Sequence, residues 1–170
     1  MTKPAVTPLY DAARVLDFAR SEVFERTFKE GMALVEETAA YLDGPGRAAS
    51  KRLSRAAALA YASESMRLTT RLMQVASWLL VQRAVRDNEI ALAEAGTEKY
   101  RLIARNEPPV SVLAATEELP EALKALIAKG AGLYERVKRL DETMYGEPAE
   151  NAANPVSDQQ AKLLAAFAQK

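Results

Sequence analysis

Carboxylates are the main acid–base groups that this chain offers, because its sequence contains no histidine and no cysteine. Their absence removes the commonest general base, the commonest metal ligand and the thiol nucleophile. Glu36 and Glu37 are adjacent, so on a helix they diverge, while Glu117, Glu118 and Glu121 form an acidic cluster that a helix start explains. No phosphate-binding glycine motif and no nucleophile elbow is present. The sequence therefore predicts no catalytic residues, no metal site and no cofactor.

Charge is unevenly distributed along the chain, although Lys+Arg and Asp+Glu are equal at 23 each. Between residues 21 and 43 the acids outnumber the bases; they are Glu22, Glu25, Glu30, Glu36, Glu37 and Asp43. Between residues 47 and 86 the bases dominate; they are Arg47, Lys51, Arg52, Arg55, Arg67, Arg71, Arg83 and Arg86. Two interpretations are open: an acidic helix that lies beside a basic one, or a basic face for an acidic protein partner. Nucleic acid is the weaker choice, since the net charge is zero and aromatic residues are not interleaved with the bases.

Three long amphipathic helices are expected to position these charges. The first begins after Ser21, a predicted N-cap, and ends at Asp43 before Gly-Pro-Gly. In it Gly31 is expected to permit a close helix crossing. The second is predicted from residues 47–50 to about 88, a length of about 55–60 Å. The third begins around residues 116–120 and ends at residues 145–146, and residues 89–105 are expected to form a short helix that breaks at residues 96–97.

These elements predict an all-α fold, an antiparallel three-helix bundle with a long central helix and flexible N- and C-terminal tails. We divide the chain into an N-terminal extension at residues 1–20 (partly disordered), a bundle domain at residues 21–146 and a flexible C-terminal tail at residues 147–170. In the tail, Leu163, Leu164 and Phe167 are candidates for a docking peptide. The sequence has neither the apolar core of a signal peptide nor an apolar run long enough to span a membrane, so we expect a cytoplasmic location and no membrane partner.

The second helix carries apolar residues on nearly every side. A narrow polar stripe contains Arg67, Thr70, Arg71 and Gln74. One apolar flank contains Tyr61, Leu68, Leu72, Val75, Ala76 and Leu79; the other contains Met66, Met73, Leu80 and Ala84. Both flanks are expected to pack against the neighbouring helices.

The polar stripe is continued by Trp78, Val81 and Val85, on a face that would be wet in a three-helix bundle. Either residues 89–103 fold back over this face, or it is an exposed patch for a partner or a second copy. The candidate contact residues for a partner or dimer are Trp78, Val81, Val85, Arg67, Arg71 and Gln74.

Residues 58–85, ALAYASESMRLTTRLMQVASWLLVQRAV, resemble a segment of the RcdA family, the regulators of CtrA degradation. FKEGMALVEETAAYLDGPGR at residues 28–47 and LYERVKRLDETMYG at residues 133–146 are similar to the same family. The resemblance covers roughly residues 28–146. It includes no short motif that assigns contacts with cargo or protease.

The resemblance implies a bacterial cytoplasmic three-helix bundle that forms homodimers and has a flexible C-terminal tail. It implies an adaptor without catalysis that helps the ClpXP protease, through its ClpX unfoldase primed by CpdR, to degrade cell-cycle regulators. Protein cargo such as transcription factors and a cyclic-di-GMP-binding adaptor are the further partners it implies. The alternative that the residues leave open is a helical DNA-associated regulatory protein that uses the basic face of the second helix.

Overall fold

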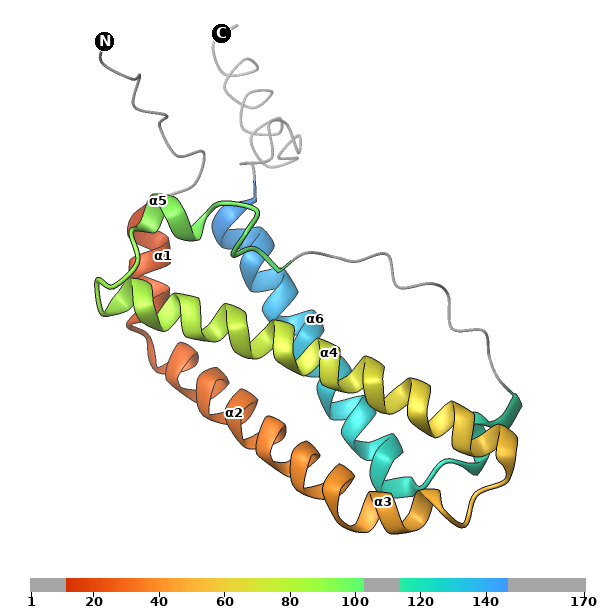
Figure 1. The fold of residues 1–170 in the computed structure, drawn as a ribbon. Helices are drawn as coiled ribbons and strands as arrows, with labels where there is room; N and C mark the ends of the chain where they lie inside the picture. Colours follow the sequence, from red (N-terminus) through yellow and green to blue (C-terminus); the bar gives the residue numbers. More distant parts are fainter. Residues whose placement is uncertain (1–11, 103–113, 147–170) are drawn as a thin grey trace, which may run out of the picture.

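The structure, a computed structural model, describes residues 12–102 and 114–146, and it is helical throughout this part of the chain. Its elements are α1 (Ala12–Ala19), α2 (Glu22–Asp43), α3 (Pro45–Ser50), α4 (Arg55–Arg86), α5 (Leu92–Ala95), the short 3₁₀ helix η1 (Ala114–Glu118) and α6 (Glu121–Tyr145). The three long helices α2, α4 and α6 pack together, with α4 against both others (Figure 1). The predicted all-α three-helix bundle with a long central helix is thereby confirmed. Both predicted tails fall largely or wholly outside the described residues.

The direction of each helix follows from the contacts along it. Contacts between α2 and α4 pair Glu25 with Arg86, Phe28 with Arg83, and Gly31 with Leu79. Contacts between α4 and α6 pair Leu68 with Gly130, Trp78 with Asp141, and Gln82 with Tyr145. Just before the two helices begin, Ser54 contacts Glu118 of η1. Thus α2 is antiparallel to α4, whereas α4 and α6 run in the same direction. The predicted antiparallel arrangement is therefore correct for α2 with α4 and wrong for α4 with α6. The parallel pair is possible because η1, which directly precedes α6, lies beside the start of α4.

Helix starts follow local capping chemistry. The Ser21 hydroxyl accepts a hydrogen bond from the Phe24 amide at 3.2 Å, which confirms the predicted N-cap of α2. The second helix differs from its prediction, because α3 ends at Ser50 and α4 begins only after Ser54. The Ser54 hydroxyl accepts from the Ala57 amide at 3.2 Å, so a second N-cap interrupts what the alanine-rich sequence suggested was one helix.

Two glycines set the closest approaches of the long helices. A Cβ on Gly31 would lie 2.7 Å from Leu79 Cδ1, and one on Gly130 would lie 2.6 Å from Leu68 Cδ1. Such distances are shorter than van der Waals contact, so any larger residue would push the leucines or the helices apart. The close crossing predicted at Gly31 is therefore confirmed.

The helix α1 packs on the bundle near the C-terminal end of α4. Val15 and Ala19 are fully buried, and the Phe18 ring lies 5.7 Å from the Phe24 ring and 6.3 Å from Trp78. Part of the predicted N-terminal extension thus contributes to the hydrophobic core. The division into an extension, a bundle domain and a tail remains a prediction.

Candidate interaction surface

The tryptophan that the sequence singled out lies in the centre of the fold, not on its surface. Trp78 is 2% exposed, and its indole Nε1 donates a hydrogen bond of 2.8 Å to the Asp141 carboxylate. Arg101 donates to both oxygens of the same carboxylate, at 3.0 and 2.9 Å, and also to the Tyr145 carbonyl at 2.8 Å. Asp141 is 2% exposed, which means that its carboxylate meets both donor side chains inside the fold and not at the surface.

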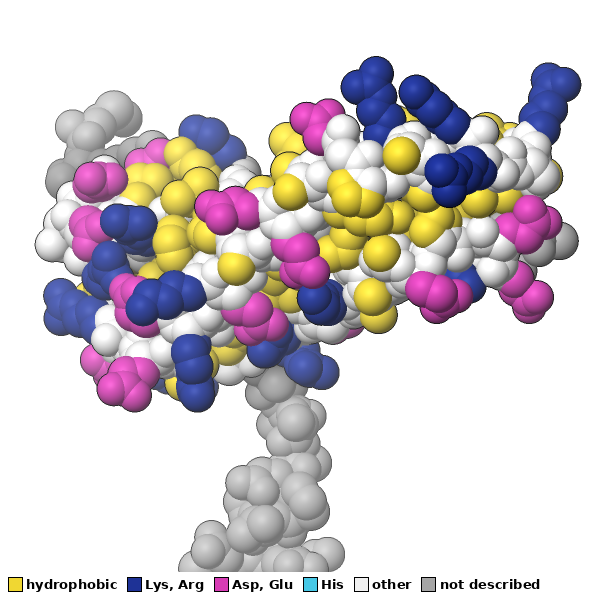
Figure 2. Space-filling view, turned by 90° about the horizontal axis from the view of Figure 1, so that it is seen from below, with side chains coloured by type: hydrophobic (Ala, Val, Ile, Leu, Met, Phe, Trp, Pro, Cys, Tyr) yellow, Lys and Arg dark blue, Asp and Glu magenta, His cyan; other side chains and the backbone are white. Residues whose placement is uncertain are grey.

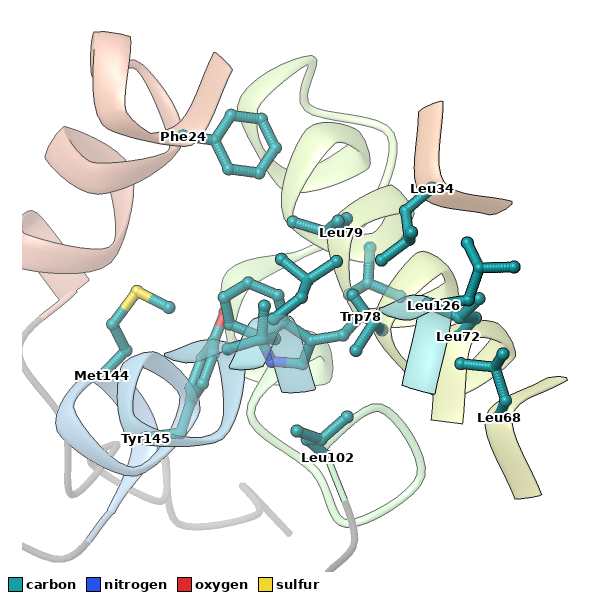
Figure 3. Close-up of a cluster of buried hydrophobic side chains, with 14 of the residues drawn as sticks. Phe24, Leu34, Leu68, Leu72, Trp78, Leu79, Leu102, Leu126, Met144 and Tyr145 are labelled. Atoms are coloured by element: carbon teal, nitrogen blue, oxygen red, sulfur yellow. The ribbon is translucent and has the colours of Figure 1, made fainter. Parts of the chain in front are cut away.

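A second buried hydrogen bond lies one turn further along both helices. The Tyr145 hydroxyl donates to Gln82 Oε1 at 2.8 Å, and both residues are buried. Figure 3 shows Trp78 and Tyr145 in one apolar cluster with Leu102, which belongs to the segment after α5. Polar pairs surrounded by apolar side chains fix the register of α4 against α6, because each slip would leave a buried group without its partner.

The exposure considered for Trp78, Val81 and Val85 is contradicted by the structure. All three side chains are buried, because α1, α6 and the segment that contains Ala95 and Leu102 cover this face of α4. Of the two interpretations, the covered one holds for the described residues. Contact of these side chains with a partner or a second copy is therefore not carried forward.

The three polar candidates lie on the surface of α4, but in two places. Arg67 is 3.9 Å from Glu64, and the Arg71 guanidinium lies 5.9 Å from the centre of the Tyr134 ring. Both arginines line a hollow of about 440 Å³ between α4 and α6. Gln74 lines a different hollow, of about 430 Å³, together with Trp78 and Arg101. Their role in partner contact remains a prediction.

Four large apolar residues of α4 are exposed, and three of them, Met66, Met73 and Leu80, belong to the flank that we expected to pack against a neighbouring helix. Leu59, Met66, Met73 and Leu80 are 64%, 73%, 67% and 51% exposed. They recur every seven residues, so they follow one face of the helix. We call these four residues the α4 stripe. The sequence pattern could not reveal the stripe, because the Trp78 side and the stripe side of the helix are both apolar. In the structure α1, α6 and the segment after α5 cover the Trp78 side and leave the stripe exposed.

Unpaired bases lie at the α3–α4 end of the stripe. Arg47, Lys51, Arg52 and Arg55 are exposed, and none of the four side chains forms an ion pair within the described residues. We call these four residues the basic corner. Figure 2 shows Lys and Arg side chains that project beside a patch of hydrophobic side chains at one end of the molecule. The sequence identified the bases but not which of them are paired.

The acidic helix α2 pairs mainly with α6. The Glu30 and Glu37 carboxylates accept from Arg136 at 2.6 Å and from Lys129 at 2.9 Å, respectively. Among the ion pairs of the described residues, the one between Arg86 and Glu25 joins α4 to α2. The expected complementarity between α2 and the following basic helix is therefore found at the C-terminal end of α4, while the basic corner has no acidic partner on α2.

Three further predictions concern metal binding, membrane spanning and the C-terminal tail. The described residues contain no group of three or more His, Cys, Asp or Glu side chains that could hold a metal ion. Within the same ranges, no helix has the length and apolar character needed to cross a membrane. The docking candidates Leu163, Leu164 and Phe167 lie outside the described residues.

Comparisons with known proteins identify the family. The crystal structure of RcdA from Caulobacter crescentus CB15 is similar to this chain, with 60% sequence identity and a TM-score of 0.66, and the match covers 78% of this chain and 99% of that one. The chain belongs to the RcdA family. The family model described as "Protein of unknown function (DUF1465)" matches residues 15–167. A search of curated proteins found no match. Membership of the RcdA family agrees with the resemblance noted for residues 28–146. The match to the family model extends further, from residue 15 within α1 to residue 167.

Proposed function

We propose that the chain is a non-enzymatic adaptor that delivers cell-cycle regulators, transcription factors among them, to the ClpXP protease primed by CpdR. The observation that carries the proposal is the 60% identity with RcdA over 78% of the chain. Likeness of fold alone would not support a shared function, because one fold serves many functions. Identity at this level extends to surface residues, through which an adaptor must act.

The surface of the bundle supports a binding role. The α4 stripe leaves several large apolar side chains exposed on one helix face, and such faces on monomeric proteins are commonly sites of association. The basic corner adds unpaired positive charge at one end, which favours an acidic protein partner.

The proposed partners are those of an RcdA-type adaptor. They are the ClpX unfoldase with CpdR, the protein cargo and a cyclic-di-GMP-binding adaptor, in a bacterial cytoplasm. A homodimer and a docking role for residues 163–167 belong to the same proposal.

Reconstituted degradation tests the adaptor role. The degradation rate of a fluorescent cell-cycle cargo is measured with ClpXP and CpdR, with and without the purified chain. We expect the chain to accelerate degradation only when CpdR is present. A substrate that ClpXP degrades without any adaptor is the control, and its rate should not change. If the folded chain accelerates no cell-cycle cargo, the proposed function is wrong.

The basic corner is also the observation that favours the DNA-associated alternative. The alternative is tested by the fluorescence anisotropy of a labelled random DNA duplex at about 50 mM and about 200 mM salt. Affinity that depends on contacts with DNA phosphates falls steeply as the salt concentration rises. Strong binding at low salt that disappears at high salt would favour the alternative. No binding at low salt would eliminate it.

A further inference from the structure

The α4 stripe has the geometry of a seam for another helix. Its residues from Leu59 to Leu80 recur every seven positions, and at about 1.5 Å per residue they span about 32 Å. A seven-residue repeat drifts by about 20° per repeat around a straight helix, so a partner helix that crosses at about 20° follows it. The residues three and four positions after Leu59, Met66 and Met73, which share their side of the helix, are small; they are Ala62, Ser63, Thr69, Thr70, Ala76 and Ser77.

A groove between α2 and α4 lies beside the stripe. It has a volume of about 210 Å³, and Met73 at its rim belongs to the stripe. Val35, Ala39 and Leu42 line it from α2, and Ala76 lines it from α4. Because its lining is almost wholly apolar and its helices carry small side chains here, the apolar side chains of a helix laid on the stripe can enter it.

The stripe has a charged end, which gives it a direction. Arg55 lies one turn before Leu59 on the same side of α4, and Arg52 lies seven residues before Leu59. At the other end, Arg86 is already paired with Glu25 and Asp87. Within the described residues, the bases of the basic corner thus form no ion pair, whereas Arg86 at the other end of α4 does.

We propose that the α4 stripe and the α2–α4 groove bind an amphipathic helix of a partner protein, with carboxylates at the end that lies over the basic corner. The inference rests on the proposed adaptor function for the presence of a protein partner, and it deepens that function by stating the partner's chemistry. The apolar side of the bound helix repeats every three to four residues over about six turns. Its carboxylates face Arg47, Lys51, Arg52 and Arg55.

A second copy of this chain fits the same surface less well. A parallel pairing of two α4 stripes places the two basic corners together, where like charges repel. An antiparallel pairing places each basic corner near Arg86, whose carboxylate partners Glu25 and Asp87 are already engaged. The parallel arrangement supplies no carboxylates to the bases, and in the antiparallel one Glu25 and Asp87 are already engaged, whereas the carboxylates of an acidic partner helix are free to pair.

Labelled helical peptides of about 22 residues test the proposal directly. The first probe carries leucines on one side and a run of glutamates at one end; the second has the same leucines with lysines at that end. Anisotropy titrations of the full chain should show tighter binding of the acidic probe, by about tenfold at low salt, and the difference should shrink as salt rises. Equal binding of both probes, or no binding of either, overturns the proposal.

Two sets of variants locate the binding surface. Met66→Glu/Met73→Glu should lower the affinity for the acidic probe by at least about tenfold, because two apolar contacts are lost. The matched control is Val23→Glu, which alters an exposed apolar residue on another side of α2 and should leave affinity unchanged. Arg52→Glu/Arg55→Glu should lower the affinity for the acidic probe and raise the affinity for the lysine probe. General loss of structure cannot produce such a reversal. Unaltered circular dichroism establishes folding of each variant.

The outcomes separate this inference from the proposed function. If the wild-type chain accelerates cargo degradation and Met66→Glu/Met73→Glu accelerates it equally, the surface is wrong while the adaptor role stands. If the wild-type chain accelerates nothing, the adaptor role fails whatever the peptides do. If sedimentation shows a dimer that Met66→Glu/Met73→Glu dissociates while probe affinity is unaltered, the stripe binds a second copy and the proposal is overturned.

Discussion

Replacing Asp141 with alanine would test whether the buried polar centre stabilises the bundle. The carboxylate accepts hydrogen bonds from Trp78 and from Arg101, and it holds the segment after α5 against α4 and α6. Asp141→Ala leaves both donors without their acceptor. The indole N–H is then buried and unpaired, while the guanidinium keeps its hydrogen bonds to two backbone carbonyls, that of Tyr145 and the longer one of residue 141 itself.

The expected loss of stability follows from the exposure of the two donors. A hydrogen bond to a charged group contributes about 1.5–3 kcal/mol, and we take about 2 kcal/mol for the indole of Trp78, which is buried. The Arg101 side chain is 23% exposed, so water partly replaces its lost acceptor, and we take about 1 kcal/mol. The sum of about 3 kcal/mol lies at the lower end of the range for removing one partner of a buried ion pair.

Urea unfolding monitored by fluorescence measures this loss, because Trp78 is the single tryptophan of the chain. Asp141→Ala should lower the free energy of unfolding by about 3 kcal/mol and the melting temperature by about 6–12 °C. Asp141→Asn, which keeps an acceptor for the indole, should lose about half as much. In a double-mutant cycle, Arg101→Met should be milder in the Asp141→Ala background than in wild type. A loss below about 1 kcal/mol for Asp141→Ala, with an unaltered urea dependence, would refute the reasoning.

Three further predictions concern packing and titration. A Cβ on Gly46 would lie 2.6 Å from the Tyr61 hydroxyl and 2.7 Å from Tyr41 Cε1, so Gly46→Ala should lower the free energy of unfolding by about 1–3 kcal/mol. The control is Gly132→Ala, whose added Cβ has no atom within 4 Å and which should raise the free energy of unfolding by about 0.5–1 kcal/mol. Urea titrations measure both. The Thr38 hydroxyl is buried and has no hydrogen-bond partner among the residues that the structure describes, so Thr38→Val should raise the melting temperature. An unaltered or lower melting temperature would show that the hydroxyl is hydrogen-bonded. Burial raises the pKa of Tyr41 and of Tyr61 above 10.0, which means that the neutral phenols are favoured in the folded state. This contribution to stability is complete below about pH 10 and is lost as pH rises further, so thermal unfolding between about pH 8 and pH 11 should show a smaller alkaline loss for Tyr61→Phe than for wild type.

Local sequence signals determined where most helices begin and end. Ser21 caps α2, Asp43 ends it before glycine and proline, and α6 ends at Tyr145 before Gly146, as predicted. These boundaries depend on a few neighbouring backbone groups, so the local sequence contains the information. The break between α3 and α4 was missed because an alanine-rich stretch favours helix on both sides of Ser54.

The candidate site was only partly predictable. The sequence showed that the second long helix is apolar on nearly every side, and that bases accumulate before and along it. It could not show that Arg86 is paired while the basic corner is not, since each ion pair joins residues that are far apart in the chain. Nor could it show that Arg101 and Asp141 meet beside Trp78.

The sequence by itself determined an all-α chain with three long helices and a resemblance to the RcdA family. Only the tertiary structure decided which side of α4 faces inward. Periodicity orients a helix when one side is apolar and the other polar, but α4 has apolar residues on both the Trp78 side and the Met73 side. Burial was then decided by what covers each side: α1, α6 and the segment after α5 enclose Trp78, and within the described residues nothing encloses the α4 stripe.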